Sequence, residues 1–176
     1  AELGITSDGF FQLTAQPRSV AIIGAGYIGV EFAGVLRALG SAVTLVALEG
    51  RVLESFDDMI SDVLLREMHK QGITTHLGFQ VAGLARTAQG IALDASDGQR
   101  LDGFDTVIWA VGRAPNTHEL DLHKAGIETR ANGIVPTDEA QNTNVRGIYA
   151  LGDITGRTPL TPVAIAAGRR LAARLF

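Results

Sequence analysis

The sequence predicts an α/β domain built on a parallel β-sheet. Three observations support this prediction: an apolar, β-branched run at 19–23, a helix-period segment over 27–39, and a second apolar run at 42–47. Short apolar runs are typical of buried parallel strands, and apolar residues three and four apart are typical of a helix that packs on one face. Together they form one strand–helix–strand unit, whose crossover we expect to be right-handed.

A second helix is predicted to begin at Ser55, whose hydroxyl can cap free amides, with Asp57 and Asp58 in the first turn near the positive end of the helix dipole. Gly72 ends this helix. Residues 73–78 then form a third strand.

The pattern changes over residues 81–101. Two modest strands, 81–87 and 91–95, are separated by Gly90 and followed by the turn residues Asp97-Gly98. We interpret them as an antiparallel β-meander that lies as a flap on the parallel sheet. Residues 106–110 return to that sheet as another strand.

A turn-rich linker, residues 113–117, follows Gly112. The last helix is predicted with Thr161 as its N-cap, Pro162 at its first position and an alanine-rich run through Arg174. This helix runs to the last residues without a capping signal, so we expect the chain to be a piece of a longer protein.

Composition excludes several functional classes. The 176 residues include no cysteine, which rules out disulfides and thiol redox chemistry within the chain and argues against structural zinc. The net charge is −4 without a run of five like charges, and no apolar stretch is long enough to span a bilayer, so we expect neither a nucleic-acid nor a membrane partner. The histidines share no metal-ligand spacing, and no metal site is predicted.

The glycine-rich turn at 24–29 reads Gly-Ala-Gly-Tyr-Ile-Gly, between a strand and a helix. Gly24 permits a sharp turn, Gly26 lets the backbone approach a pyrophosphate, and Gly29 lets the helix pack against the strand. The helix N-terminus offers free amides to phosphates. This context predicts a Rossmann-like dinucleotide site, with a tight turn that binds no ligand as the alternative.

The end of the second strand indicates which nucleotide is preferred. A carboxylate there accepts the ribose hydroxyls of NADH, whereas arginines pair with the 2′-phosphate of NADPH. Glu49 is the carboxylate at this position and Arg51 is the nearby cation, which favours NADH. Alternatively, Glu49 is a solvated loop charge. Glu31, on the first helix, either reaches towards a cofactor or a flavin domain or faces water.

Five segments in this order, 24–31, 109–116, 141–144, 149–153 and 161–169, resemble the class I pyridine-nucleotide-disulfide oxidoreductases, and the third and fifth resemble the glutathione reductase branch. The resemblance implies that residues 1–18 connect from an FAD domain, 19–112 form the NAD(P)H-binding domain and 113–176 return to the FAD domain as a partial segment. It assigns NAD(P)H binding to the glycine turn, Glu31 and Gly112, with the Tyr27 ring gating the nicotinamide pocket. The residues expected at the two cofactors are Gly24, Gly26, Tyr27, Ile28, Gly29, Glu31, Glu49 and Gly112 for NAD(P)H, and Asp153 and Thr161 for FAD.

By this resemblance, the parent enzyme passes hydride from NAD(P)H to FAD and then electrons through an active-site disulfide to a glutathione-type disulfide. It is expected to be a cytoplasmic homodimer, and this chain is expected to contain none of its catalytic residues. NADPH-dependent glutathione reductases carry arginines at the positions of Leu48 and Glu54. Their absence makes residues 46–49 more similar to NADH-preferring glutathione amide reductases of purple sulfur bacteria, so glutathione amide disulfide is an alternative substrate.

Other interpretations remain. Lipoamide dehydrogenase and mercuric reductase share the expected architecture, although residues 141–144 and 161–169 favour the glutathione branch. The chain could instead be a free-standing nucleotide-binding regulatory module, or a scaffold domain whose cofactor site has degenerated.

Overall fold

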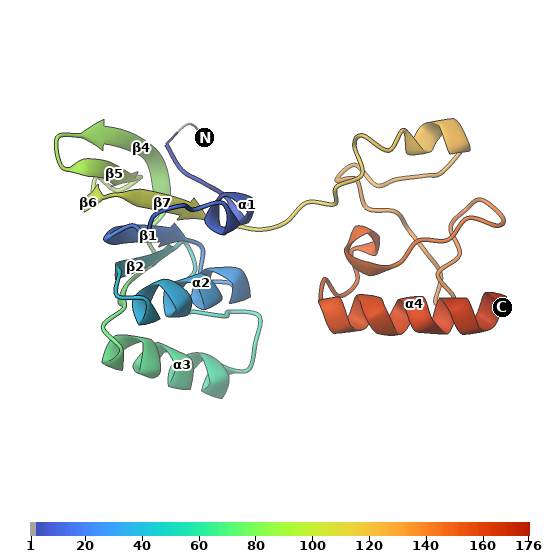
Figure 1. Ribbon diagram of the computed structural model, residues 1–176, viewed down its shortest axis with the longest axis horizontal. Helices are drawn as coiled ribbons and strands as arrows, with labels where there is room; N and C mark the ends of the chain where they lie inside the picture. Colours follow the sequence, from blue (N-terminus) through green and yellow to red (C-terminus); the bar gives the residue numbers. More distant parts are fainter. Residues whose placement is uncertain (1–2) are drawn as a thin grey trace. The chain divides into compact units, whose positions relative to one another are not determined.

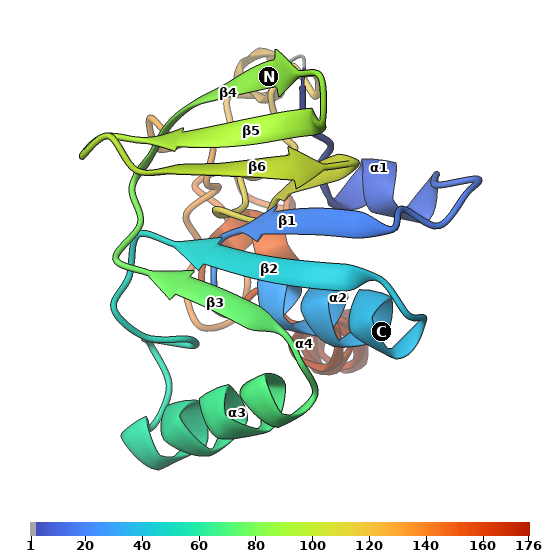
Figure 2. The same cartoon turned by 90° about the vertical axis from the view of Figure 1, so that its left-hand side faces the viewer.

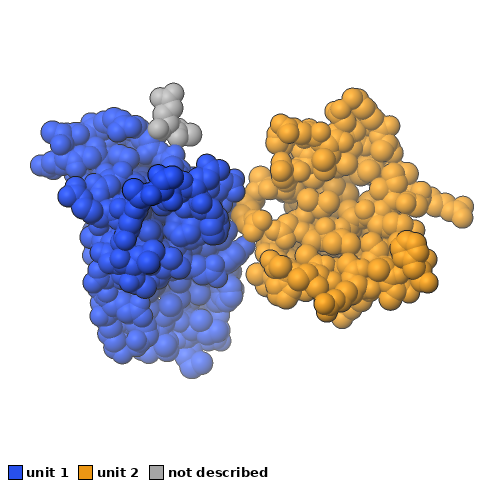
Figure 3. Space-filling model, viewed as in Figure 1, with its two compact units in different colours: residues 1–112 blue, residues 113–176 orange. Residues whose placement is uncertain are grey.

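The computed structural model describes residues 3–176, which divide into two compact units (Figure 3). The first unit extends to Gly112, and the second runs from Arg113 to Phe176. In the part of the chain that the structure describes, none of the helices is both long and apolar enough to cross a membrane.

The first unit is built on a four-stranded parallel sheet with the order β3-β2-β1-β7. The predicted strand–helix–strand unit is confirmed, and α2 and α3 lie on the same face of the sheet (Figures 1 and 2). The elements of this layer are β1 (Ser19–Ile23), α2 (Tyr27–Ala38), β2 (Ala42–Ala47), α3 (Asp58–Lys70), β3 (Thr74–Leu77) and β7 (Thr106–Trp109).

The opposite face of the parallel sheet is covered by the antiparallel sheet that the sequence predicted as a flap (Figure 2). It has the strand order β4-β5-β6 and therefore one strand more than predicted. The additional strand β6 has only five residues, Arg-Leu-Asp-Gly-Phe, which show little apolar character. The three strands are β4 (Val81–Thr87), β5 (Gly90–Ala95) and β6 (Arg100–Phe104).

Strand β1 separates two hydrophobic cores because successive side chains of a strand point to opposite faces. Val20 and Ile22 pack with α2 and α3, whereas Ala21 and Ile23 pack against the antiparallel sheet. All four are 5% exposed or less, so β1 is buried on both faces, as its continuous apolar run predicted.

The start of α3 corrects the sequence prediction. Ser55 lies in a turn, and the helix begins at Asp58 with Asp57 as its N-cap. The Asp57 side chain accepts a hydrogen bond from the amide of Met59 at 2.9 Å. The amide of Phe56 donates to the carbonyl of Leu53, and this turn delays the helix past the serine.

Residues 3–18 belong to the first unit, and the sequence predicted no helix or strand for them. Ile5 forms a parallel bridge to Ile108 on β7, and a short helix α1 (Ser7–Phe11) follows. The Phe10 ring stacks on Phe32 of α2, with ring centroids 4.0 Å apart. Five helical residues are too few to show helical periodicity, which explains why α1 was missed.

The second unit contains little regular structure. It has two 3₁₀ turns, η1 (Leu122–Ala125) and η2 (Gly152–Thr155), and one long helix, α4 (Thr161–Leu175). Thr161 is the first residue of α4 rather than its predicted N-cap, and Leu160 occupies the cap position without a side-chain hydrogen bond.

Asp105 is expected to make the stability of the first unit depend on acid. Its carboxylate accepts hydrogen bonds from the amides of Arg18 and Ser19 at 2.9 and 3.2 Å, and these bonds hold the pKa of Asp105 below its ordinary value of 3.8. A lowered pKa in the folded state contributes stability above the unfolded pKa, and this contribution is lost as pH falls through the folded value. Asp105→Asn should therefore lower Tm near pH 7, and the difference from the unaltered chain should shrink below about pH 4.

Thermal unfolding monitored by circular dichroism between pH 2.5 and 7 measures this difference. Glu31→Gln, which removes an exposed carboxylate on α2, is the control and should show no such trend. A Tm difference for Asp105→Asn that is the same at every pH would contradict the prediction.

Candidate dinucleotide-binding site

The glycine turn lies at the carboxyl edge of the parallel sheet, where three strands end level with one another. Ile23 on β1 pairs in register with Val46 on β2 and with Trp109 on β7. Just beyond it, the Gly24 amide donates to the Val46 carbonyl and the Ala110 amide donates to the Ile23 carbonyl, each at 2.7 Å. The crevice outside the carboxyl ends of parallel strands is where α/β sheets bind ligands.

Two glycines of the turn are required by close backbone packing. Gly24 has a φ of +112°, and a Cβ there would overlap the Ala110 carbonyl oxygen. A Cβ on Gly29 would overlap the Gly24 carbonyl oxygen. Because neither glycine carries a Cβ, the first turn of α2 can lie directly against β1 and the segment after β7. No larger residue fits at either position.

Gly26 has a different environment. It is exposed, its φ of −72° suits any residue, and a Cβ there would meet no atom within 4 Å. Neither packing nor backbone conformation therefore explains a glycine here. Open space over an exposed backbone fits the close approach of a pyrophosphate.

The N-terminus of α2 is electrostatically suited to an anion. Its cap residue is Gly26, which supplies no side-chain hydrogen bond, and its first turn carries no acidic residue. In α3, by contrast, Asp57 caps the helix and Asp58 lies in the first turn. The positive end of the α2 dipole is thus left without an anionic side chain of its own, which suits a phosphate group.

The other residues expected near the nicotinamide nucleotide have different degrees of exposure. Tyr27 and Ile28 are half-buried in the first turn of α2, whereas Glu31 is exposed. Gly112, three residues after β7, is exposed with a φ of +144°, and no atom lies within 4 Å of a Cβ built there. The structure therefore places the glycine turn and the segment leading to Gly112 at the same sheet edge.

Glu49 follows β2 at this edge. Its side chain is exposed, and among residues 3–176 its carboxylate has no ion-pair partner. Its backbone carbonyl accepts a hydrogen bond from the Gly78 amide at 3.0 Å, which anchors the residue to the end of β3. Leu48 beside it is 63% exposed.

The loop from β2 to α3 folds back onto the glycine turn, which the sequence did not predict. The amide of Leu53 donates to the Ala25 carbonyl at 2.8 Å, and Val52 and Leu53 are buried. Leu53 has a φ of +51°, a conformation that a non-glycine residue rarely adopts. Two adjacent apolar residues in a loop do not by themselves indicate which part of the fold they contact.

Arg51, in the same loop, is bound to α3. Its guanidinium lies 2.5 Å from an Asp58 carboxylate oxygen and 3.2 Å from an Asp62 carboxylate oxygen. Partial desolvation opposes the charge of Arg51, but the hydrogen bonds and charges of Asp58 and Asp62 outweigh it and raise the pKa of Arg51.

The two residues expected near FAD lie in the second unit. Asp153 is in η2 and forms an ion pair with Arg113 at 2.8 Å, a partner that the sequence did not predict. Thr161 is exposed at the start of α4. A Cβ built on Gly152 would lie 3.3 Å from the Ala164 Cβ, so η2 packs closely on α4.

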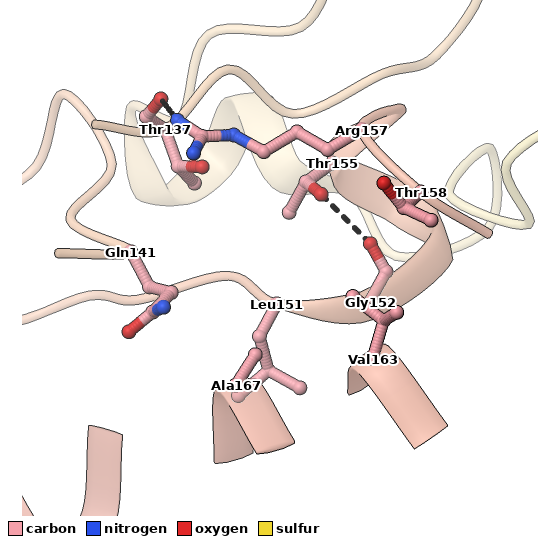
Figure 4. A pocket seen from close by; sticks show the side chains of 9 residues that line it. All are labelled: Thr137, Gln141, Leu151, Gly152, Thr155, Arg157, Thr158, Val163 and Ala167. Carbon is pink, nitrogen blue, oxygen red and sulfur yellow. Dashed lines mark hydrogen bonds between the residues drawn. The ribbon is translucent and has the colours of Figure 1, made fainter. Parts of the chain in front are cut away.

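A small pocket lies between η2 and α4 (Figure 4). The Thr155 hydroxyl closes η2 by donating to the Gly152 carbonyl at 2.8 Å, and Arg157 donates to the Thr137 carbonyl at 2.7 Å. The pocket measures about 60 Å³, whereas pockets for drug-sized ligands measure about 300–1,000 Å³. By itself it is therefore too small for a flavin ring.

Comparison with known proteins places this geometry in a family. The family model described as pyridine nucleotide-disulphide oxidoreductase matches residues 3–168. Glutathione reductase of Schizosaccharomyces pombe is 46% identical over 178 residues, and that of Yarrowia lipolytica is 45% identical over 179 residues. Each match covers the whole chain, and the chain spans 38% of the length of each relative.

Solved structures agree with these sequence matches. LpdA from Mycobacterium tuberculosis has a TM-score of 0.87 at 30% identity, covering 97% of this chain and 37% of LpdA. The HOCl-induced flavoprotein disulfide reductase RclA from Escherichia coli has a TM-score of 0.90 at 28% identity, covering 99% of this chain and 41% of RclA.

The different environments of the glycines in α2 predict opposite effects on stability. Gly29→Ala should destabilise the chain severely, because its Cβ would overlap backbone and force β1 and α2 apart. Gly34→Ala, in the same helix with no atom near a built Cβ, should stabilise it by about 1 kcal/mol through helix propensity. Urea unfolding measures both changes, and equal stability of the two variants would show that the close contact at Gly29 relaxes freely.

Proposed function

Because the chain belongs to the pyridine nucleotide-disulphide oxidoreductase family, we propose that it is the nicotinamide-nucleotide-binding part of a flavoprotein disulfide reductase of the glutathione reductase type. In this proposal, residues 1–18 lead from an FAD domain, 19–112 bind the nucleotide, and 113–176 belong to the FAD domain. The division of the structure after Gly112 supports the second of these boundaries.

The observation that carries the proposal is the open space over Gly26, between two glycines that packing does require. Gly24 and Gly29 bring α2 against the sheet, and Gly26 leaves its N-terminal amides accessible. In this proposal the pyrophosphate binds at that N-terminus, and Tyr27 and Ile28 line the path towards the nicotinamide. Gly112 allows close approach at the end of β7.

We propose NADH as the preferred nucleotide. The exposed carboxylate of Glu49 is available to accept ribose hydroxyls, and Leu48 and Glu54 replace the arginines of NADPH-dependent glutathione reductases. A carboxylate about 5 Å from a phosphate costs about 3 kcal/mol at an effective dielectric of 20, and solvent screening at an exposed site reduces this penalty. Glu31, which is exposed on α2, is proposed to face the flavin side of the site.

The second unit is proposed to complete a flavin site whose other residues lie outside this chain. Asp153 would accept a hydrogen bond from the ribityl chain, and Thr161 would lie near the flavin ring. The ion pair with Arg113 supports this role, because it fixes the Asp153 carboxylate in position while leaving it partly exposed.

The nucleotide, when bound, supplies a hydride for the flavin, and a disulfide is the final electron acceptor. This chain has no cysteine, so the thiols of such a reaction belong to the parent protein, which we propose is a cytoplasmic homodimer. Identity of 46% and 45% to glutathione reductases, against 30% to LpdA and 28% to RclA, favours a glutathione-type disulfide as substrate. Because residues 46–49 resemble those of glutathione amide reductases, glutathione amide disulfide is proposed as the alternative substrate to glutathione disulfide.

The role of Gly26 can be tested directly by calorimetric titration of the 176-residue chain with NADH. Gly26→Ala should bind NADH at least about tenfold more weakly while remaining folded, because its Cβ occupies only the space proposed for the pyrophosphate. Gly34→Ala is the matched control on the same helix and should bind as the unaltered chain does. Undiminished binding by Gly26→Ala would contradict the proposed site.

The preference for NADH depends on Glu49. NADPH should bind about tenfold more weakly than NADH to the unaltered chain, because the 2′-phosphate meets this carboxylate. Glu49→Gln should reduce that difference several-fold, whereas Glu67→Gln, an exposed carboxylate in the last turn of α3, should leave it unchanged. Parallel titrations with both nucleotides provide the measurement, and tighter binding of NADPH by the unaltered chain would overturn the preference.

A further inference from the structure

The loop that follows β2 is rich in carboxylates and contains a single cation. Residues 48–62 include five acidic side chains, and Arg51 is the only basic residue among them. An arginine in this loop could pair with the 2′-phosphate of NADPH. Whether Arg51 is free to do so therefore bears directly on which nucleotide the site accepts.

The structure shows that Arg51 is engaged within the protein. Nη1 donates to Asp58 Oδ1 at 2.5 Å, and Nη2 donates to Asp62 Oδ1 at 3.2 Å and to the Asp58 backbone carbonyl at 3.0 Å. Three hydrogen bonds thus join one guanidinium to the first two turns of α3. We refer to Arg51, Asp58 and Asp62 as the Arg51 clip.

Several hydrogen bonds to carboxylates fix the orientation of a guanidinium and also neutralise its charge. To reach a phosphate, Arg51 would have to leave two carboxylates, which would then lie without a partner beside the N-terminus of α3. The clip therefore opposes 2′-phosphate binding, because these hydrogen bonds would have to break before the guanidinium could reach a phosphate.

We propose, on the basis of the nucleotide-binding function proposed above, that Asp58 and Asp62 are specificity-determining residues, because in the clip they withhold Arg51 from the nucleotide. Glu49 then stands at the end of β2 without a free cation beside it, and the site rejects the 2′-phosphate. Discrimination against NADPH is accordingly a property of Asp58 and Asp62 as well as of Glu49.

The clip also positions the loop that carries Glu49. Two residues beyond Arg51, the Leu53 amide is bonded to the Ala25 carbonyl of the glycine turn, and the Ser61 hydroxyl lies 3.3 Å from the Leu53 carbonyl. The φ of +51° at Leu53 is unfavourable for a leucine and must be maintained by its surroundings. The bonds from Arg51 to α3 provide part of that restraint.

The test is a set of calorimetric titrations of the 176-residue chain with NADH and NADPH. In Asp58→Asn/Asp62→Asn the guanidinium is released, and the ratio of the NADPH Kd to the NADH Kd should fall about tenfold. Arg51→Gln should leave that ratio within about twofold of its original value, because the side chain does not contact the phosphate. In the triple variant Arg51→Gln/Asp58→Asn/Asp62→Asn, the fall in this ratio should be only about twofold, since the released Arg51 produces most of the effect of the two asparagines.

Two results would overturn the proposal. One is selective loss of NADPH affinity in Arg51→Gln, which would make Arg51 a phosphate ligand already. The other is an unchanged ratio in Asp58→Asn/Asp62→Asn while NADH still binds. Absence of NADH binding to the unaltered chain would instead refute the proposed function itself. Asp62→Asn alone removes only the longer of the two ion pairs, at 3.2 Å, so it serves as the milder variant and should give a smaller fall in the ratio.

Hydrogen exchange supplies a readout that does not require nucleotide. Arg51→Gln should accelerate exchange of the Leu53 amide several-fold, because the loop loses its restraint from α3. Arg66→Gln is the control, since it removes an exposed arginine from the same helix. Unchanged exchange at Leu53 in Arg51→Gln would contradict the positioning part of the proposal.

Discussion

The close packing of the first turn of α2 against β1 and the segment after β7 is the constraint on which the nucleotide-binding unit depends. It requires glycine at Gly24 and Gly29, because a Cβ at either position would overlap a backbone carbonyl. Once this packing is made, the amides of the first turn of α2 point out of the carboxyl edge of the sheet. The same contact thus fixes the helix against the core and exposes the amides at which the pyrophosphate is proposed to bind.

A parallel sheet needs cover on both of its faces, and here the two covers differ. The helices α2 and α3 bury one face, and the antiparallel sheet of β4, β5 and β6 buries the other. The helical face carries the proposed phosphate site, since α2 begins at the glycine turn. The antiparallel sheet packs on Ala21 and Ile23 and thereby buries the face of β1 that lies opposite α2.

The sequence predicted those features that local patterns determine: the parallel strands, α2, the glycine turn and the antiparallel flap. It misplaced the start of α3 because Ser55 and Asp57 are both good caps, and the turn at Leu53, a tertiary feature, decides between them. It missed β6 and α1 because five residues carry too weak a periodicity. For the candidate site it indicated the glycines and Glu49, whose role in binding stays a prediction, but not the bond from Leu53 to Ala25, which joins loops far apart in sequence.

The charges at the end of β2 show why sequence alone leaves the nucleotide preference open. Arg51 lies two residues from Glu49, and in the sequence it is equally able to bind a phosphate or to pair with a carboxylate. In the structure Asp58 and Asp62 lie four residues apart in α3, and therefore on the same side of the helix, where both pair with Arg51. The fold of the loop between β2 and α3 brings Arg51 to these two carboxylates, and this tertiary feature decides which charges the proposed nucleotide site presents.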